Sequence, residues 1–470
     1  MRSLDPPTLS LRPDTASDLG PNALKRELVP TQGRLSRVSL SDPILTPSAT
    51  PDAGRRLKLL FLVTEDWYFC SHRLPVARAA RAAGFEVVVA TRVRAHGEEI
   101  RDEGFTLRPI AWRRRGDGLR GAVRAISAIA RIYRSERPDI VHHVALKPVL
   151  FGGIARRLAF ARSADAPASV DSVMGLGSGF STTTIAGRLL RPQLGLALRL
   201  VTGRTRGWIV VQNPEDCAAL AEIGLDTARI ALIRGSGIDI SRFLPLPEPG
   251  GDTITVALVS RMLRDKGVLA AAAAVRRLRA EGLAVELLLA GPTDPDNANS
   301  LSEETLRSLA AEPGIEWLGP VPDVRTVWRR AAIAVLPSTY GEGVPKTLLE
   351  AAACGRPLIA TDVPGCREVV RPGATGILVP PHDLGALAGS IAVLAGDPAK
   401  RAAMGRAGRE WIESGFTDEI VARDTLALYR AALTDQGRFR APRQRTKNPR
   451  HRGEIRPNNH QPPQSRNREA

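Results

Sequence analysis

The pattern that most constrains this chain is an alternation of short apolar runs with helical stretches, and it occurs twice. In the first half, apolar runs at residues 57–63, 86–90, 107–112 and 139–142 alternate with helical patterns at 74–83, 119–135 and 149–158. A second set of apolar runs lies at residues 253–260, 285–291, 315–318, 331–336 and 357–361. Strands that alternate with helices form parallel βαβ units. We therefore predict an α/β protein with two doubly wound sheets, whose ligands lie at the carboxyl ends of the strands.

Length and composition fit two domains with an extension at each end. The chain has 470 residues, 43% of them hydrophobic, which suffices for two or three domains of roughly 100–200 residues each. We predict a disordered extension over residues 1–54, a first domain over 55–243, a second domain over 252–434 and a disordered basic tail over 436–470. The stretch at 244–251, L-P-L-P-E-P-G-G, has the composition of a linker.

The cysteines and the apolar runs bear on the compartment. Four scattered cysteines form no C-x-x-C pair, which argues against a disulfide framework or a cysteine metal site. No apolar run approaches the roughly 18–20 residues of a membrane span, and the N-terminus lacks the apolar core of a signal peptide. We expect a cytoplasmic protein, peripheral on the inner face of the membrane.

The positive charge is concentrated in two places. The net charge is +17, and the tail carries nine Arg and Lys447 against Glu454 and Glu469. Such a tail can bind RNA, rest on an anionic membrane surface or stay solvated, and the sequence leaves these alternatives open. Residues 119–137 form a helical pattern with Ala, Ile and Val on one face and Arg on the other. The apolar face packs on a sheet, while the Arg face suits anionic lipid.

The stretch at 336–361 combines a helix start with two carboxylates. A turn follows a buried strand, a helix opens at Pro345, and Gly355 suits its left-handed stop. A helix N-terminus is a natural seat for a phosphate, whereas Glu342 and Glu350 would repel an anion unless they accept hydrogen bonds from hydroxyls. This combination indicates a nucleotide diphosphate with a sugar attached. The alternative is an ordinary αβ unit with solvated acids.

Other strand ends carry residues suited to the same ligand. Arg261 and Lys266 follow the first strand of the second set, and a guanidinium with an ammonium suits a diphosphate. Gly235 and Gly237 would let the backbone approach a ligand closely.

Three loops of the first half are candidate acceptor sites. Ser71 is a candidate helix cap, which places His72 and Arg73 in a first helical turn where cations favour an anion nearby. The next loop contains V-H-H-V-A-L-K-P, with His142 and His143 on opposite faces of a strand so that one of them faces the cleft. Residues 174–180 form a glycine-rich loop.

The second half resembles the retaining glycosyltransferases of the GT-B fold, family GT4. The resemblance rests on E-x7-E at Glu342 and Glu350, on the surrounding E-G-V-P and A-x-A-x-G-x-P, and on Arg261 with Lys266. It implies two Rossmann-like domains that face each other across a cleft. It also implies a nucleotide-sugar donor, which we expect to be a UDP-sugar, and no metal or other cofactor. It also implies that the basic pair stabilises the departing diphosphate, Glu342 binds the donor sugar and Glu350 the ribose. The remaining donor-binding residues that we expect are Gly235, Gly237, Gly319, Val321, Gly343, Val344, Pro345 and Lys346. Of these, Gly319 and Val321 belong to G-P-V, which resembles the segment that contacts the nucleotide base in the family.

The first half resembles GT4 enzymes that build polysaccharides and lipid-linked oligosaccharides. The similarity lies in F-x-S-H-R, in the His pair and in G-L-G-x-x-F. It implies a polyprenyl-diphosphate-linked or polysaccharide acceptor and a catalytic part for His142 or His143. The acceptor-binding residues that it implies are His72, Arg73, Lys147, Gly175 and Gly177. The chain lacks the Gly-Gly pair of many GT4 members, so their acceptor contacts do not carry over.

Two other functions stay open at this point. A nucleotide-sugar epimerase can share the fold, and it would convert the donor without an acceptor. A basic nucleic-acid-binding protein would explain the charge, and its affinity would fall with salt and with loss of the tail. We expect no specific nucleic acid, because neither alternative explains E-x7-E together with R-x4-K.

Overall fold

The computed structural model describes residues 55–112, 118–161, 163, 165–175, 185–202, 207–341 and 343–436, without the side chains of 185–191. The extension predicted at 1–54 and nearly all of the tail predicted at 436–470 lie outside these residues. In this part of the chain, no helix combines the length and apolar character needed to cross a bilayer.

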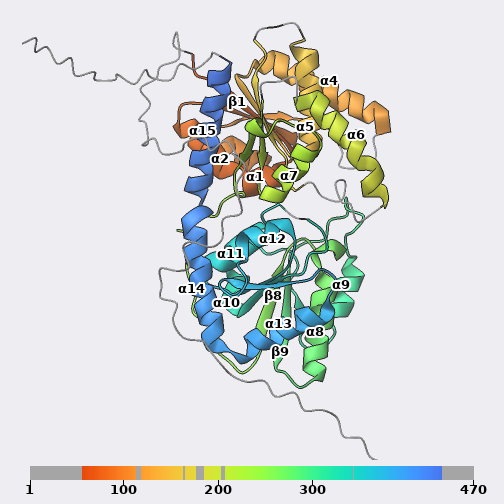
Figure 1. Ribbon diagram of the computed structural model, residues 1–470, viewed down its shortest axis with the longest axis vertical. Helices are drawn as coiled ribbons and strands as arrows, with labels where there is room; N and C mark the ends of the chain where they lie inside the picture. The colour runs from red at the N-terminus through yellow and green to blue at the C-terminus, as the bar shows by residue number, and fades with distance from the viewer. Residues whose placement is uncertain are drawn as a thin grey trace, which may run out of the picture.

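Two parallel sheets form the centres of the two halves (Figure 1). Their inner strands are short and mostly buried on both faces, as parallel sheets covered by helices require, whereas the edge strands β3 and β10 are partly exposed. The first sheet has the order β3-β2-β1-β4-β5-β6-β7 and the second β10-β9-β8-β11-β12-β13. The strands are β1 (Lys58–Glu65), β2 (Glu86–Arg92), β3 (Thr106–Pro109), β4 (Ile140–Val144), β5 (Ala168–Ser172), β6 (Trp208–Val211), β7 (Ile230–Leu232), β8 (Ile254–Val259), β9 (Val285–Ala290), β10 (Ile315–Trp317), β11 (Ile333–Leu336), β12 (Leu358–Thr361) and β13 (Gly376–Val379).

Helices cover the sheets and connect their strands. In the first half these are α1 (Asp66–His72), α2 (Leu74–Ala82), α3 (Gly97–Asp102), α4 (Gly118–Glu136), α5 (Leu146–Ala159), α6 (Ile185–Thr202) and α7 (Pro214–Glu222). The second half has α8 (Val268–Ala280), α9 (Glu303–Ala310), α10 (Arg325–Arg330), α11 (Lys346–Ala353), α12 (Pro364–Val369), α13 (Leu384–Gly396) and α14 (Pro398–Gly415), and α15 (Asp418–Asp435) follows. Short 3-10 turns occupy Thr227–Arg229 and Arg264–Lys266.

The terminal helix joins the two halves. Thr417 caps α15, whose residues Leu428, Tyr429 and Leu433 belong to the core of the first sheet. Figure 1 shows α14 beside the second half and α15 beside α2 in the first. The last helix, which the resemblance to GT4 enzymes would have cross back over the first domain, thus packs on the first half here.

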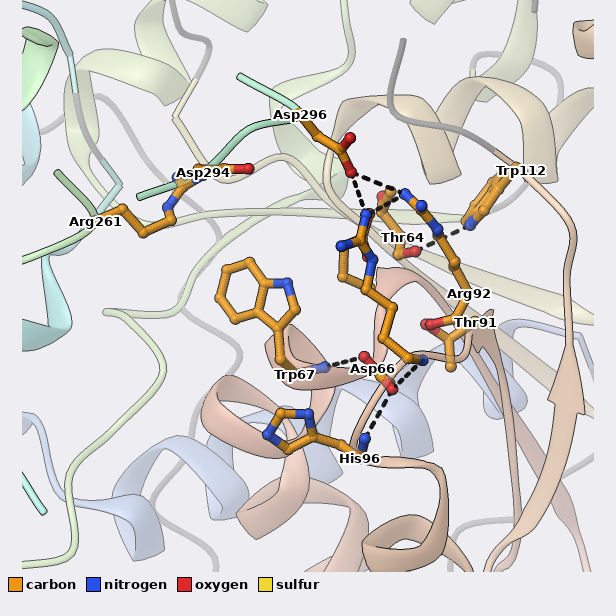
Figure 2. A network of polar contacts seen from close by, with 12 residues as sticks. Thr64, Asp66, Trp67, Thr91, Arg92, His96, Trp112, Arg261, Asp294 and Asp296 are labelled. Atoms are coloured by element: carbon orange, nitrogen blue, oxygen red, sulfur yellow. Dashed lines mark hydrogen bonds and ion pairs between the residues drawn. The ribbon is translucent and has the colours of Figure 1, made fainter. Parts of the chain in front are cut away.

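The loop predicted after the first strand is instead a helix. Asp66 is fully buried, and its carboxylate accepts the backbone N–H groups of Trp67 at 2.8 Å, Arg94 at 2.6 Å and His96 at 2.9 Å. This carboxylate lies at the start of α1, and the loop after β2 is attached to it (Figure 2). The predicted Ser71 cap is wrong, because Ser71 lies inside α1 and α2 begins after Arg73 with a proline in its first turn.

Candidate active site

The turn that carries Lys266 lies beside the loop that leads into α11. Strands β8 and β11 are neighbours in the sheet, so the loops after them meet. Gly267 has a φ of 75°, and a Cβ there would lie 2.1 Å from the carbonyl oxygen of Pro337. The N–H of Thr339 donates to the carbonyl of Asp265 at 2.9 Å. The Lys266 turn therefore packs directly on the loop that carries the first glutamate of the E-x7-E pattern.

Arg261 lies in the cleft between the halves. Its guanidinium donates to the Asp294 carboxylate, with 2.5 Å between Nη1 and Oδ2. The same guanidinium lies 5.8 Å from the ring centroid of Trp67, a residue of α1 in the other half. Arg261 and Asp294 lie side by side in Figure 2, with the Trp67 ring nearby. A phosphate that binds Arg261 must therefore compete with the Asp294 carboxylate.

The cleft at Arg261 has a volume of about 620 Å³. The first half contributes Trp67 and Ser71 to its wall, and the second contributes Arg261, Pro320 and Val321. The segment expected to contact a nucleotide base thus lies beside the predicted diphosphate residue. The carbonyl of Gly319 already accepts the N–H of Gly291 at 2.8 Å, which leaves the following residues to line the cleft.

An acidic residue also connects the halves at this cleft. Asp296 pairs with Arg94, just after β2, and, at 3.3 Å, with Arg92, the last residue of β2. The two arginines also lie 3.4 and 3.5 Å from the buried Glu65 carboxylate. Figure 2 shows Asp296 directed at Arg92 across the gap between the halves. The loop after β9 is therefore in contact with both halves.

The helix after β11 carries a lysine and a glutamate on one face. Lys346 Nζ donates to the Ser71 carbonyl in the first half. Burial raises the pKa of Glu350 to about 7, and Lys346 and Arg242 only partly oppose this shift. The helix begins at Lys346, one residue later than predicted, and Pro345 is its N-cap residue. Glu342 lies outside the described residues, so its part at the donor sugar stays a prediction.

The glycines expected to approach a ligand instead approach other parts of the chain. A Cβ at Gly343 would lie 2.2 Å from Gln212 Oε1, which accepts the N–H of Val344 at 3.0 Å. A Cβ at Gly235 would lie 3.2 Å from Val344, and one at Gly237 2.5 Å from Asp418 Oδ1 at the start of α15. The need for glycine therefore comes from contacts within the chain, and ligand contacts there stay predictions.

The first-half residues expected at the acceptor are distributed over two places. His72 stacks on Tyr68 with ring centroids 4.1 Å apart, and burial lowers the pKa of His72 well below its usual value. Arg73 is adjacent and buried. Lys147 lies elsewhere, with its ammonium 5.5 Å from the Trp112 ring centroid and 5.4 Å from that of Phe151. Gly175 has a left-handed φ of 68°, while Gly177 lies outside the described residues.

The two strand histidines are internal. His142 is 1% exposed and hydrogen-bonds Tyr429 of α15 at 2.6 Å and Ser172 at 2.7 Å. His143 is fully buried and hydrogen-bonds Asp171 at 2.5 Å and Tyr133 at 2.8 Å. The prediction that one ring faces the cleft is wrong, because all four ring nitrogens have buried partners, three in the first half and one on α15. A catalytic part for either histidine is without support from this geometry.

Several residues of the site were not singled out in the sequence. These residues are Asp294 after β9, Gln212 after β6 and Tyr68 in α1. They stand in ordinary polar or aromatic stretches of the sequence, and no characteristic spacing marks them. Asp294 and Asp296 do stand in a polar loop after a buried strand, a signal that indicates a ligand loop without naming the residues. In the part of the chain that the structure describes, no group of three or more His, Cys, Asp or Glu is placed to hold a metal ion.

Family models match both halves of the chain. Residues 253–397 match the family described as Glycosyl transferases group 1, and residues 58–198 match Glycosyl transferase 4-like. Both domains are therefore glycosyltransferase domains, and the chain belongs to the GT4-type glycosyltransferases with the GT-B fold.

Individual relatives and structures agree with this assignment. The chain is 32% identical to D-inositol 3-phosphate glycosyltransferase of Kribbella flavida over 44% of this chain and 52% of that protein. It thus spans about half the length of that relative. It is 24% identical to N,N'-diacetylbacillosaminyl-diphospho-undecaprenol alpha-1,3-N-acetylgalactosaminyltransferase of Campylobacter jejuni, over 76% of this chain and 94% of that protein. The structure of Anabaena HepE in complex with UDP has a TM-score of 0.63 and 16% identity, and covers 79% of this chain and 98% of its own.

Proposed function

We propose that the protein transfers a sugar, with retention of configuration, from a UDP-sugar to a polyprenyl-diphosphate-linked or polysaccharide acceptor. The observation that carries the proposal is the cleft, where Arg261 lies beside the base-contact candidate Val321. In the same domain, the Lys266 turn packs on the loop before α11. Anabaena HepE binds UDP in the same fold, and the Campylobacter relative acts on a diphospho-undecaprenol acceptor by its name.

In this proposal the basic residues act on the charge that develops as the donor bond breaks. Arg261 and Lys266 stabilise the departing diphosphate, and such preorganised donors are worth most where water is excluded. Asp294 yields Arg261 to the phosphate when the donor binds. Glu350 accepts a hydrogen bond from a ribose hydroxyl in its ionised form. The reaction requires no metal, because the two cations neutralise the leaving group.

An anionic membrane surface completes the proposal. Helix α4 packs against α5 and α5 against α6, and together they present exposed apolar side chains that include Leu119, Val123, Leu158 and Leu196. Arg120, Arg124, Arg131 and Arg134 of α4 are exposed between them, and the acid of these three helices, Glu136, is buried. A surface of this kind suits anionic headgroups and the upper acyl region. It would hold the enzyme where a lipid-linked acceptor resides.

The decisive experiment is a screen of nucleotide-sugars for hydrolysis and transfer. We expect release of UDP from one UDP-sugar, slow without acceptor and faster with a short prenyl-diphosphate-linked sugar. The product anomer, determined by NMR, tests retention. No turnover of any nucleotide-sugar would contradict the proposal. Conversion of the donor to its epimer, without release of nucleotide, would instead support the epimerase alternative.

A further inference from the structure

Three hydrogen-bond donors converge on one thioether sulfur at the junction of the two domains. The Met174 sulfur receives Nη2 of Arg73, the hydroxyl of Tyr68 at 3.8 Å and Nε2 of Gln212 at 3.6 Å. These donors come from the α1–α2 connection, from α1 and from the end of β6, which are separate segments of the chain. A thioether is a weak acceptor, so this arrangement leaves strong donors poorly satisfied.

Arg73 is the charged member of this group, and its charge is not compensated. The residue is 4% exposed, and its Nε has no hydrogen-bond partner. Among the residues that the structure describes, no carboxylate pairs with this guanidinium, and burial lowers its pKa. An unpaired buried charge costs several kcal/mol. Such a cost persists where an anionic ligand supplies the missing partner.

The surroundings of the Met174 sulfur are those of a ligand site between the domains. Gln212 accepts the Val344 N–H through its oxygen, next to the start of α11. Lys346 of α11 donates to the carbonyl of Ser71, which lies in α1 near Tyr68 and Arg73. His72, whose ring stacks on Tyr68, lies one residue from Arg73. Lys346 and His72 thus add a cation and an imidazole to the surroundings of the three donors.

We propose that Tyr68, Arg73 and Gln212 form an oxyanion receptor for a phosphoryl group, whose place the Met174 sulfur takes in the ligand-free protein. Binding displaces the thioether and gives the three donors an oxygen acceptor that carries charge. The inference rests on the proposed function, which supplies two phosphoryl sources. One is the distal phosphate of the donor and the other is a phosphate of the lipid-linked acceptor.

The test is calorimetric titration of the full chain with inorganic pyrophosphate, UDP, UMP and geranyl diphosphate. We expect Arg73→Met to weaken pyrophosphate binding by about 10–100-fold, the scale of a lost hydrogen bond to a charged group. Arg78→Met, the same change at an exposed position of α2, should leave binding unchanged. Met174→Leu conserves the volume but removes the sulfur acceptor, and it should bind pyrophosphate at least as tightly as the wild type.

The stability of the variants separates a binding role from a structural one. Without ligand, Arg73→Met should melt no lower than the wild type, because it removes an uncompensated buried charge. If that variant does not fold, Arg73→Lys keeps the charge but loses the planar donor set, and it should bind pyrophosphate several-fold more weakly. Wild-type affinity in the variant that folds would overturn the inference, as would a wild-type protein that binds none of the four probes.

The probes also identify the source of the phosphoryl group. Loss of UDP binding in the Arg73 variant, with geranyl diphosphate unaffected, assigns the site to the donor, and the reverse result assigns it to the acceptor. Donor turnover with anion binding that does not depend on Arg73 would reject this site alone. Pyrophosphate binding that depends on Arg73, without turnover of any nucleotide-sugar, would reject the proposed function alone.

Discussion

The Arg261 guanidinium is held by the Asp294 carboxylate, with 2.5 Å between donor and acceptor, at the wall of the interdomain cleft. A carboxylate at this position competes with a phosphate for the same donor. Asp294→Asn keeps the shape but removes the competing charge, so UDP should bind about 2–5-fold more tightly, the scale of a partly exposed ion pair. Calorimetric titration with UDP measures the affinity of both proteins. Asp296→Asn, which loses the pairs to Arg92 and Arg94 instead, is the matched control. Weaker UDP binding in Asp294→Asn would refute the competition.

The basic pair should matter for turnover more than for folding. Arg261→Ala and Lys266→Ala should each lower kcat by about 10²–10³, the usual scale for one lost charge-stabilising donor. Arg264→Ala removes an exposed charge from the same turn and should leave kcat near that of the wild type. Steady-state rates on the identified donor, with circular dichroism to verify folding, decide the matter. Near wild-type rates in both variants would exclude the diphosphate role.

Glu350 should contribute to donor binding in a pH-dependent way. Its pKa is about 7 because burial disfavours the charged form. Ribose hydroxyls donate to the ionised carboxylate, so donor affinity should rise as the pH rises through about 7. Glu350→Gln should bind the donor more weakly above pH 7 and lose this dependence, as calorimetry at pH 6 and 8 would show. Equal pH dependence in both proteins would contradict the assignment.

The same shift predicts the effect of pH on stability. Between the ordinary glutamate pKa near 4.5 and about 7, the folded state binds more protons at this position than the unfolded state. The contribution of Glu350 to stability therefore falls as the pH rises through this window and is constant above it. The difference in the free energy of unfolding between Glu350→Gln and the wild type should therefore shift in favour of the variant by on the order of 1–3 kcal/mol from pH 5 to pH 8. Urea unfolding at the two pH values measures the gain, and a variant that loses stability at pH 8 would contradict it.

The general architecture could be predicted from the sequence because it depends on local patterns. Apolar runs of strand length alternate with helical periodicity, and parallel order then places successive strand ends at one edge. This is why the Lys266 turn and the loop before α11 were expected at one edge of the sheet, where the structure has them in contact. The additional helix α1 escaped prediction, because it depends on the buried Asp66 carboxylate and the backbone of a distant loop.

The details of the site depend on partners that only the tertiary structure supplies. His142 has the sequence context of a cleft residue, but Tyr429 of the terminal helix reaches it from 287 positions away. Arg73 was expected at the acceptor beside a helix start, yet it is buried and its guanidinium donates to the Met174 sulfur. Gly237 was expected at a ligand and instead makes room for Asp418. In each case a contact between residues far apart in the sequence determines where the residue lies, and no local sequence pattern encodes that contact.

The contact between the terminal helix and the first sheet should be measurable as stability. Tyr429→Phe removes the hydroxyl that hydrogen-bonds His142 and leaves a buried ring nitrogen without its partner. We expect a loss of about 1–3 kcal/mol in the free energy of unfolding. Thr434→Ala, at an exposed position of the same helix, should change it by less than about 0.5 kcal/mol. Equal effects of the two changes in urea unfolding would show that the His142 contact is dispensable.

The last prediction concerns the surface formed by α4, α5 and α6. Leu119 is 82% exposed and Val123 55%, with Arg120 and Arg124 beside them on α4. If this surface rests on anionic lipid, each basic residue near the membrane contributes about 1 kcal/mol. The double variant Arg120→Glu, Arg124→Glu should then no longer float with vesicles that contain anionic lipid. High salt should likewise weaken vesicle binding by the wild-type protein.

Two controls separate this surface from the basic tail. Deletion of residues 436–470 should weaken vesicle binding only in part, because α4 retains its arginines. Arg276→Glu with Arg277→Glu reverses two exposed charges on α8 of the other domain and should leave binding unchanged. Equal binding to neutral and anionic vesicles, or loss of binding by the tail deletion alone, would reject α4–α6 as the membrane surface. Retained donor hydrolysis in the α4 variant would show that the loss concerns the membrane and not the active site.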